Sequence, residues 1–413
     1  LRINGQQKKA LKLLFGVERK LKKLIKYFEE DDYKKFIFAS YGIIIDEWLH
    51  SIYEYNNYSL KEKFHYMIHV NEIIQNRLLA EKLSTLVSNQ DGLINIEKML
   101  SVFEHSQSDI GLVYITSTIR NLNNENCFYI LLADPINQDS SYCIDMIRLS
   151  DLNSIRNDFI GKFIQDPGSP KKEQDHILDR YGEVLFRNSN HPQSKNTIAI
   201  PNNFSLTLPM HMARIDGKYL YEISEYNYLP NLHILNKMNE KSTKSINGLT
   251  IYYTSKDKRA LAEAEAIDKS LINIKVNFIK DPELKEIKDN NKDGGSVHFI
   301  AHGEDGKIVF NKRVLKGDEI CEVLQDSLIN VSFSVCKSGK IIQKELYPYN
   351  HSSWSHKMLS KNAKKVLTHI WDLGQYASKS FITSYYKNEN MSKHITNYKP
   401  SEYGGYMKWG YLE

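Results

Sequence analysis

Beyond residue 196, short apolar runs that favour β-structure alternate with segments that favour helices. The apolar runs lie at residues 197–200, 249–253, 274–278, 297–301, 331–335, 365–369 and 406–411. Among the segments between them, Lys258–Ser270 has a strongly helix-forming composition of Ala, Glu, Lys and Leu. Strands that alternate with helices typically build a largely parallel sheet with helices on both faces. This alternation therefore predicts an α/β fold for the C-terminal part of the chain.

Two of these runs end in a chemically reactive side chain. Val297–Ala301 leads to His302 and Gly303, and Val331–Val335 leads to Cys336. In parallel α/β sheets, functional groups gather at the carboxyl ends of strands, so neighbouring strands would place the imidazole beside the thiol. A histidine in that position favours the thiolate and can return a proton to a leaving group. The pair predicts the catalytic dyad of a cysteine peptidase.

The residues around the pair fit the same chemistry. The main-chain N–H groups of Gly303 and Cys336 would form an oxyanion hole, and the missing side chain at Gly303 would let the backbone approach the substrate. Taken singly, a cysteine or a histidine at a strand end is more often a packed core residue. The prediction therefore depends on the two occurring together.

Other histidines and cysteines give no sign of a metal site. On a strand, His298 and His302 would be about 13 Å apart, too far for one metal ion. No CxxC pair occurs, and Cys321 is expected in a helix as a core residue. The histidines of the N-terminal region lack matching carboxylate or cysteine spacing; they are His50, His65 and His69. We expect neither a metal nor another cofactor.

Residues 6–104 have a different pattern, in which apolar side chains recur at spacings of three and four. That spacing predicts helices, and tetratricopeptide-like hairpins are one arrangement for them, although regular self-similarity is missing. Short β-type runs follow between 110 and 146, and helices are expected at about 151–165 and 173–187. The expected division is a helical region (1–108), an accessory α+β part (109–195) and a core (196–413).

Composition narrows the class of protein. Hydrophobic residues make up 41% and charged residues 25%, which is typical of a soluble globular protein. No apolar run is long enough to cross a membrane, and the start does not resemble a signal peptide. We therefore expect a cytoplasmic protein without a membrane span.

The net charge of +5 arises largely from a basic cluster near the start of the chain. Its members are Lys8, Lys9, Lys12, Arg19, Lys20, Lys22, Lys23 and Lys26. Such a face could contact nucleic acid or an acidic partner, or it could be the solvated side of an amphipathic helix. Both interpretations stay open at this point.

Several segments beyond residue 196 carry motifs whose order matches a known family. They are residues 196–210, 219–232, 262–266, 298–303, 334–339, 363–371 and 404–410. His298-Phe-Ile-Ala-His302-Gly303 is similar to His-Xaa-Ala-Cys-His-Gly, and Ser334-Val-Cys336-Lys-Ser-Gly339 is similar to Ser-Ala-Cys-Glu-Ser/Thr-Gly. In these features the chain resembles the CHAT family of caspase-like cysteine peptidases, which are relatives of separase.

The resemblance implies a caspase-like α/β fold behind an all-helical N-terminal region, and cysteine endopeptidase activity with His302 and Cys336 as the dyad. The sequence also departs from the family pattern at several positions. Lys337 replaces the acid that usually follows the cysteine, and Gly374 and Gln375 stand where an acidic pair is expected. The remaining acids that could line a substrate pocket are Glu304, Asp305 and Asp372.

The same resemblance suggests a regulated bacterial protease that cleaves a partner protein. A role in antiphage defence, for example by activating a gasdermin-like effector, would fit, with the helical region sensing or docking a regulator. Two alternatives belong to other classes. One is a non-catalytic scaffold with the same fold, and the other is a nucleic-acid-responsive sensor that acts through the basic start.

Overall fold

The computed structural model describes residues 42–75, 109–116, 119–120, 126–136, 141–187, 191–201, 208–232, 248–271, 273–290, 295–304, 306–324, 328–338, 342–343, 351–361, 363–372, 375–387 and 398–410, with a few single positions. Within these residues, no helix is long and apolar enough to span a membrane. Most of the basic cluster and most of the proposed helical repeats lie outside the described residues.

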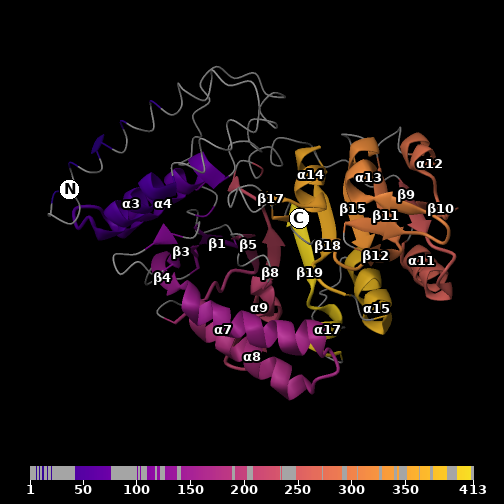
Figure 1. The fold of residues 1–413 in the computed structure, drawn as a ribbon, viewed down its shortest axis with the longest axis horizontal. Coiled ribbons are helices and arrows are strands. Elements are labelled where there is room, and N and C mark those ends of the chain that lie inside the picture. Colours follow the sequence, from indigo (N-terminus) through magenta and orange to yellow (C-terminus); the bar gives the residue numbers. More distant parts are fainter. Residues whose placement is uncertain are drawn as a thin grey trace.

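A mixed sheet of 12 strands forms the centre of the molecule (Figure 1). Its order is β10-β9-β11-β15-β18-β19-β8-β5-β1-β3-β2, and β4 pairs with β3 beside this path. The strands are β1 (Ile110–Ile115), β2 (Ile119–Arg120), β3 (Asn126–Ala133), β4 (Tyr142–Arg148), β5 (Asn196–Ile200), β8 (Glu225–Tyr228), β9 (Gly248–Tyr253), β10 (Lys275–Lys280), β11 (Ser296–Ile300), β15 (Asn330–Ser334), β18 (Lys365–His369) and β19 (Tyr406–Gly410).

The sheet consists of two halves that run in opposite directions. In the C-terminal half, β10, β9, β11, β15 and β18 are parallel neighbours. In the N-terminal half, β8, β5 and β1 are parallel to one another and to β19. Because β18 and β19 are antiparallel, the carboxyl ends of β1, β5 and β8 lie at the opposite edge from those of β11, β15 and β18.

Helices cover both faces of each half (Figure 1). In the C-terminal half, α11 (Lys258–Ser270) and α15 (Gln375–Tyr386) lie on one face. The opposite face carries α12 (Leu284–Asp289), α13 (Gly317–Val323) and α14 (Trp354–Ser360). Helix α11 begins after Asp257, whose side chain accepts the N–H of Arg259 at 3.0 Å and so satisfies a helix-terminal donor.

The N-terminal half packs between two helical pairs. One pair is α3 (Gly42–Glu54) and α4 (Leu60–Gln75), which contacts the sheet where His50 Nδ1 lies 2.6 Å from the Tyr129 hydroxyl. The other pair is α7 (Leu149–Phe159), continued by the π-helix η2 (Ile160–Gln165), and α8 (Lys171–Leu185). Smaller elements are η4 (Met210–Met212), β6 (Arg214–Ile215), β7 (Lys218–Tyr219), α9 (Leu220–Ile223), β12 (His302–Glu304), β13 (Lys307–Val309), β14 (Val314–Lys316), β16 (Ile342–Gln343), β17 (His351–Ser352) and α17 (Pro400–Tyr403).

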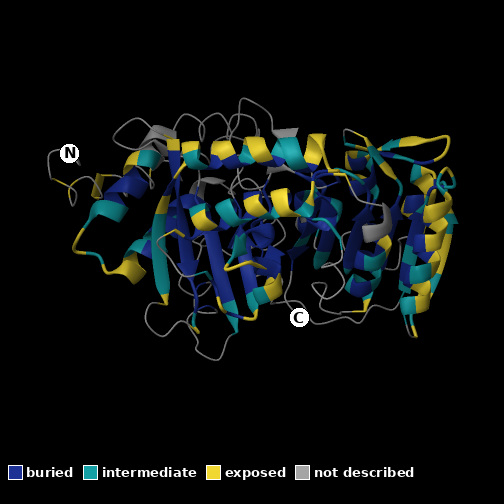
Figure 2. Cartoon of the chain, turned by 90° about the horizontal axis from the view of Figure 1, so that it is seen from below, coloured by how far each residue is buried: buried dark blue, intermediate teal, exposed yellow. Residues whose placement is uncertain are grey.

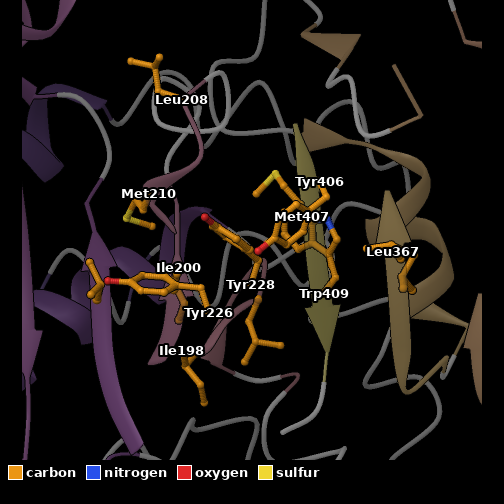
Figure 3. Close-up of a cluster of buried hydrophobic side chains, with 14 of the residues drawn as sticks. Ile198, Ile200, Leu208, Met210, Tyr226, Tyr228, Leu367, Tyr406, Met407 and Trp409 are labelled. Carbon is orange, nitrogen blue, oxygen red and sulfur yellow. The ribbon is translucent and has the colours of Figure 1, made fainter. Parts of the chain in front are cut away.

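Apolar side chains from both halves meet where β19 lies between β18 and β8. Ile198 and Tyr226 from the N-terminal half, Leu367 from β18, and Met407 and Trp409 from β19 are all buried in this cluster (Figure 3). The central strands are dark in the burial view, whereas β4 and β10 are partly exposed and the helices expose their outer sides (Figure 2). One core therefore extends across the join between the two halves.

The predicted α/β architecture is confirmed, and the predicted strands agree with the observed ones to within one or two residues. One expectation needs correction, because the segment expected as a single helix over 151–165 changes to a π-helix at Ile160. The short strand β8 and the hairpins that follow His302 were not expected. Since β5 lies between β1 and β8, the sheet continues across residue 196, and the proposed domain boundaries stay predictions.

Candidate active site

Neighbouring strands bring His302 and Cys336 to the same edge of the sheet. Strands β11 and β15 are parallel, with Ile300 opposite Ser334, and the N–H of Ala301 donates to the Ser334 carbonyl oxygen at 3.4 Å. Two residues farther along each strand stand His302 and Cys336. Because adjacent strands lie about 4.8 Å apart, the imidazole and the thiol start from neighbouring backbone positions.

Gly303 makes the closest approach between the two segments. A Cβ atom added at Gly303 would lie 1.8 Å from the Cys336 carbonyl oxygen and 2.9 Å from a methyl carbon of Val335. Any side chain at this position would therefore push the histidine and cysteine segments apart. The sequence suggested glycine for access of the substrate, whereas in the structure glycine is required by the contact between the two strand ends.

Exposure distinguishes Cys336 from the core cysteine Cys321. None of the four cysteines forms a disulfide, and Cys336 is half-buried whereas Cys321 is buried within α13. Burial raises the pKa of the Cys321 thiol to about 12, so this thiol stays protonated and unreactive. His302 is exposed, at the start of β12. Both members of the predicted pair are thus accessible from solvent.

The chain turns sharply at Val335–Ser338, which we call the Cys336 turn. Lys337 adopts a φ of 58°, a left-handed conformation that costs a non-glycine residue about 1–2 kcal/mol. The end of β18 holds this turn: the N–H of Lys337 donates to the Trp371 carbonyl oxygen at 3.3 Å, and the N–H of His369 donates to Ser338 Oγ at 2.9 Å. The position of Cys336 therefore depends on β18 as well as on its own strand.

Asp257 is a neighbour of His302 that the sequence did not single out. Strand β9 ends beside β11, where the N–H of Thr254 donates to the Ile300 carbonyl oxygen at 3.0 Å, and Asp257 follows three residues later. Its pKa is lowered chiefly by the hydrogen bond from the Arg259 side chain, with a smaller contribution from His302. Asp257 thus lies within electrostatic range of the imidazole, although Arg259 balances most of its charge.

Asp281 fixes the hairpin that follows His302. Its carboxylate accepts the N–H of Ser255 at 2.9 Å and the N–H of Asn311 at 3.1 Å, and it also accepts the Ser255 hydroxyl. Asn311 lies between β13 and β14, so this carboxylate ties the β12–β13–β14 sheet to the end of β9. Desolvation would raise the pKa of Asp281, but the hydrogen bonds from Ser255 and Asn311 outweigh it and lower the pKa.

A buried polar cluster lies behind the two strand ends, on the face covered by α11 and α15. The His298 ring is enclosed by Ser334 Oγ, 3.1 Å from Nε2, by the Tyr386 hydroxyl, 3.2 Å from Nδ1, and by Glu263, 3.8 Å from Nε2. Burial lowers the pKa of His298, so its ring is neutral near pH 7. His298 is thus a satisfied core histidine, and among the described residues no group of three or more His, Cys, Asp or Glu side chains could hold a metal ion.

The residues expected to line a substrate pocket are only partly described. Glu304 is exposed on β12, and Asp372 lies 3.6 Å from Lys337 Nζ, with 63% of the Asp372 side chain exposed. Asp305 and Gly374 lie outside the described residues, and Gln375 begins α15. Lys337 balances part of the charge of Asp372, and the assignment of these acids to a substrate pocket stays a prediction.

Comparison with solved structures identifies the fold. The chain is similar to separase in two crystal structures of the Saccharomyces cerevisiae separase–securin complex, determined at 3.0 and 2.6 Å resolution. The TM-scores are 0.61 and 0.59, and the sequence identity is 10% in both cases. The matches cover 98% of this chain but 37% of the separase chain, so this chain spans little more than a third of that protein.

The fold is therefore the caspase-like fold found in separase, as expected from the sequence. No family model matches the chain, and no curated protein matches it either. The more specific assignment to the CHAT family stays a prediction that depends on the ordered motifs.

Proposed function

We propose that this protein is a cysteine endopeptidase in which Cys336 is the nucleophile and His302 the general acid and base. The observation that carries the proposal is the register of β11 and β15, with the contact between Gly303 and the Cys336 carbonyl. A left-handed residue directly after a half-buried thiol also supports it, because strained backbone conformations cluster at functional sites.

The chemistry follows from the two side chains and the adjacent main chain. The Cys336 thiolate attacks the substrate carbonyl carbon and forms a C–S bond, while the N–H groups of Gly303 and Cys336 stabilise the oxyanion. His302 donates a proton to the leaving amine as the C–N bond breaks. A water molecule that gives its proton to His302 then attacks the acyl carbon, and the C–S bond breaks to restore the thiolate.

We further propose that the enzyme is a regulated bacterial CHAT protease acting on a partner protein, with antiphage defence as its setting and a gasdermin-like effector as one candidate substrate. The ordered motifs support the family, and the helical region before residue 109 offers a place for a regulator. That the similar separase chains were solved in complex with securin is consistent with control by a bound protein. Glu304, Asp305 and Asp372 are the proposed pocket acids.

The direct test is to label and to disable the pair. The purified chain is treated with peptidyl acyloxymethyl ketones that carry Arg, Lys, Asp or Leu before the reactive group, and the modified cysteine is identified by mass spectrometry. We expect modification of Cys336, its loss in His302→Ala, and no change in Cys143→Ala, which removes another partly exposed thiol. The preferred probe also tests whether the pocket acids select a basic residue.

Cleavage is measured separately, by sequencing new protein N-termini in a bacterial extract after incubation with the wild-type chain or with Cys336→Ala. New N-termini that depend on Cys336 support the endopeptidase. Equal cleavage by Cys336→Ala would rule it out. If no probe labels Cys336 under any condition, the non-catalytic scaffold is the better description.

A further inference from the structure

Trp371 makes contacts with the Cys336 turn through its main chain and with the N-terminal half through its side chain. Its carbonyl oxygen accepts the N–H of Lys337, the residue directly after Cys336, at 3.3 Å. Because Lys337 is left-handed, the turn would relax to an extended or helical conformation without such external bonds. Trp371 lies two residues beyond the end of β18, the strand that pairs with β15.

The indole ring of Trp371 packs against Phe159, Phe163 and Gly405. Its edge meets the stacked rings of Phe159 and Phe163, with centroid distances of 5.2 and 6.3 Å, at the junction of α7 and η2. A Cβ added at Gly405 would lie 2.6 Å from the ring. The ring is 4% exposed, so it cannot move without moving α7, η2 or the start of β19.

A buried hydrogen-bonded junction extends this contact to α8. Trp371 Nε1 donates to the Ser401 carbonyl oxygen at 3.1 Å. Gln174 of α8 then holds Ser401 from both sides: its Oε1 accepts the Ser401 N–H at 3.1 Å, and its Nε2 donates to Ser401 Oγ at 3.0 Å. Gln174 and Ser401 are both almost fully buried, and breaking such a bond would leave a buried polar group unpaired at a cost of about 1–3 kcal/mol.

We propose that Trp371 is a positioning residue that holds the Cys336 turn beside His302 and couples it to the α7–η2–α8 helices of the N-terminal half. The kinetic part of this inference rests on the proposed endopeptidase function. A shift of these helices, such as a bound regulator would produce, moves Trp371 and thereby the thiol. The π-helix at this point has the local geometry often found at functional sites.

The test compares two buried tryptophans, of which Trp371 also has a main-chain hydrogen bond to the Cys336 turn. Trp371→Phe removes an indole N–H that donates at 3.1 Å to Ser401, and Trp409→Phe removes an indole N–H that donates at 3.1 Å to Thr368. Both rings are buried, but of the two only Trp371 bonds to the Cys336 turn in the described residues. Alkylation of Cys336 by iodoacetamide is followed by mass spectrometry of its peptide from about pH 5 to about pH 10, with cleavage rates measured where a substrate is in hand.

For Trp371→Phe we expect alkylation near pH 7 to slow by about tenfold and the measured titration midpoint of Cys336 to rise, because the thiol moves away from an imidazole that favours the thiolate. The value of kcat is expected to fall about 10- to 100-fold with little change in KM. Trp409→Phe is expected to lower Tm by about as much as Trp371→Phe does, without moving the titration midpoint of Cys336. Equal effects of the two variants, or no shift in Trp371→Phe, would overturn the positioning role.

A second variant tests the coupling from a distance. Gln174→Leu removes the amide that holds Ser401 and lies in α8, remote in sequence from the turn. We expect the titration midpoint of Cys336 to shift upward, by less than in Trp371→Phe. If Trp371→Phe does not fold, Gln174→Leu takes its place in the test. An unchanged midpoint in folded Gln174→Leu would contradict the coupling. Since alkylation requires no proteolysis, the positioning role is decided even if Cys336→Ala shows that the endopeptidase proposal is wrong.

Discussion

Both halves of the sheet contain a set of parallel strands, but the residues that follow these strands differ. In the C-terminal half, β11 and β15 run out into an exposed histidine and a half-buried cysteine. In the N-terminal half, the residues directly after β1, β5 and β8 are Thr116, Pro201 and Leu229, which are all buried, as is Val335 directly after β15. Two positions after β8 stands Pro230, which is buried too, whereas His302 and Cys336 reach solvent at the second position after their strands. Exposure two residues beyond the strand end therefore distinguishes β11 and β15 from β8.

His211 of the N-terminal half differs from His302 in its exposure. His211 in the N-terminal half is buried, with Nδ1 2.8 Å from the Tyr228 hydroxyl and its ring against Tyr406. Burial lowers the pKa of His211 to about 3, so it stays neutral at any physiological pH and cannot exchange protons there. His211 is thus a packing residue, as His298 is in the C-terminal half.

The largest expected effect concerns the dyad itself. Cys336→Ala or His302→Ala should reduce cleavage by at least about 1000-fold, because either change removes the covalent step or its proton transfer. Tm should change little, since neither side chain is buried. The measurement is the rate of appearance of new N-termini, with His211→Asn as the counterpart from the N-terminal half. His211→Asn should lower Tm and leave the cleavage rate of the folded fraction intact; the reverse pattern would contradict the comparison.

Gly303→Ala should affect both activity and stability. The added Cβ would overlap the Cys336 carbonyl oxygen, so relief requires the two strand ends to separate. We expect a loss of about 1–3 kcal/mol in the free energy of unfolding and a fall in kcat of about 100-fold. Gly248→Ala is the control, because an added Cβ there would make only an ordinary contact, 3.6 Å from the Lys275 carbonyl oxygen. Wild-type kcat in Gly303→Ala would show that the close approach is dispensable.

A buried acid in the N-terminal half predicts a dependence of stability on pH. Glu72 in α4 accepts hydrogen bonds from the Tyr114 hydroxyl at 2.9 Å and from the Leu232 N–H at 3.3 Å. Burial raises the pKa of Glu72 to about 7, against the lowering effect of these bonds. The folded state therefore binds more protons than the unfolded state between about pH 4.5 and 7, so stability falls as the pH rises through this window.

The expected loss from this group is on the order of 3 kcal/mol at most. Urea unfolding of Glu72→Gln should show a flatter profile over the same window, whereas Glu62→Gln, an exposed change at the start of α4, should keep the wild-type slope. A slope that Glu72→Gln leaves unchanged would mean that another group causes the dependence.

The smallest expected effect is at Lys337. Glycine accepts the left-handed conformation without strain, so Lys337→Gly should raise the free energy of unfolding by up to about 1 kcal/mol. Loss of the exposed ion pair with Asp372 should offset this by about 0.5 kcal/mol or less. Lys337→Ala loses the ion pair but keeps the strain, and thus separates the two contributions in a denaturation experiment.

The sequence could predict the strands that lead to His302 and Cys336 because each is a continuous apolar run closed by a reactive residue. It could also predict that the two ends are neighbours, since consecutive strands of an α/β sheet usually pair. It could not predict the reversal between β18 and β19, because hydrophobic patterning does not encode strand direction. Nor could it identify Gln174, Ser401 and Trp371 as partners, because a buried glutamine in an amphipathic helix looks like a solvated one.

Lys337 illustrates a further limit. Its position after the cysteine suggested a change in local charge, and the structure adds a left-handed backbone conformation that the sequence did not suggest. Asp257 was likewise invisible in the sequence, since its proximity to His302 arises from the pairing of β9 with β11 rather than from spacing along the chain.

The place of β19 in the sheet has a consequence for synthesis of the chain on the ribosome. Strand β8 lies between β5 and β19 in the sheet. Its pairing with β19 requires Trp409, which is made about 180 residues after its partner Tyr228. At roughly 5–20 residues per second, β8 waits on the order of 10–40 s with that edge unpaired, a period in which chaperones or a second chain could occupy it. Late in this interval, Trp371 has been made but Ser401 has not. The thiol of the nascent chain is therefore expected to reach its full reactivity only after residue 401 has been made.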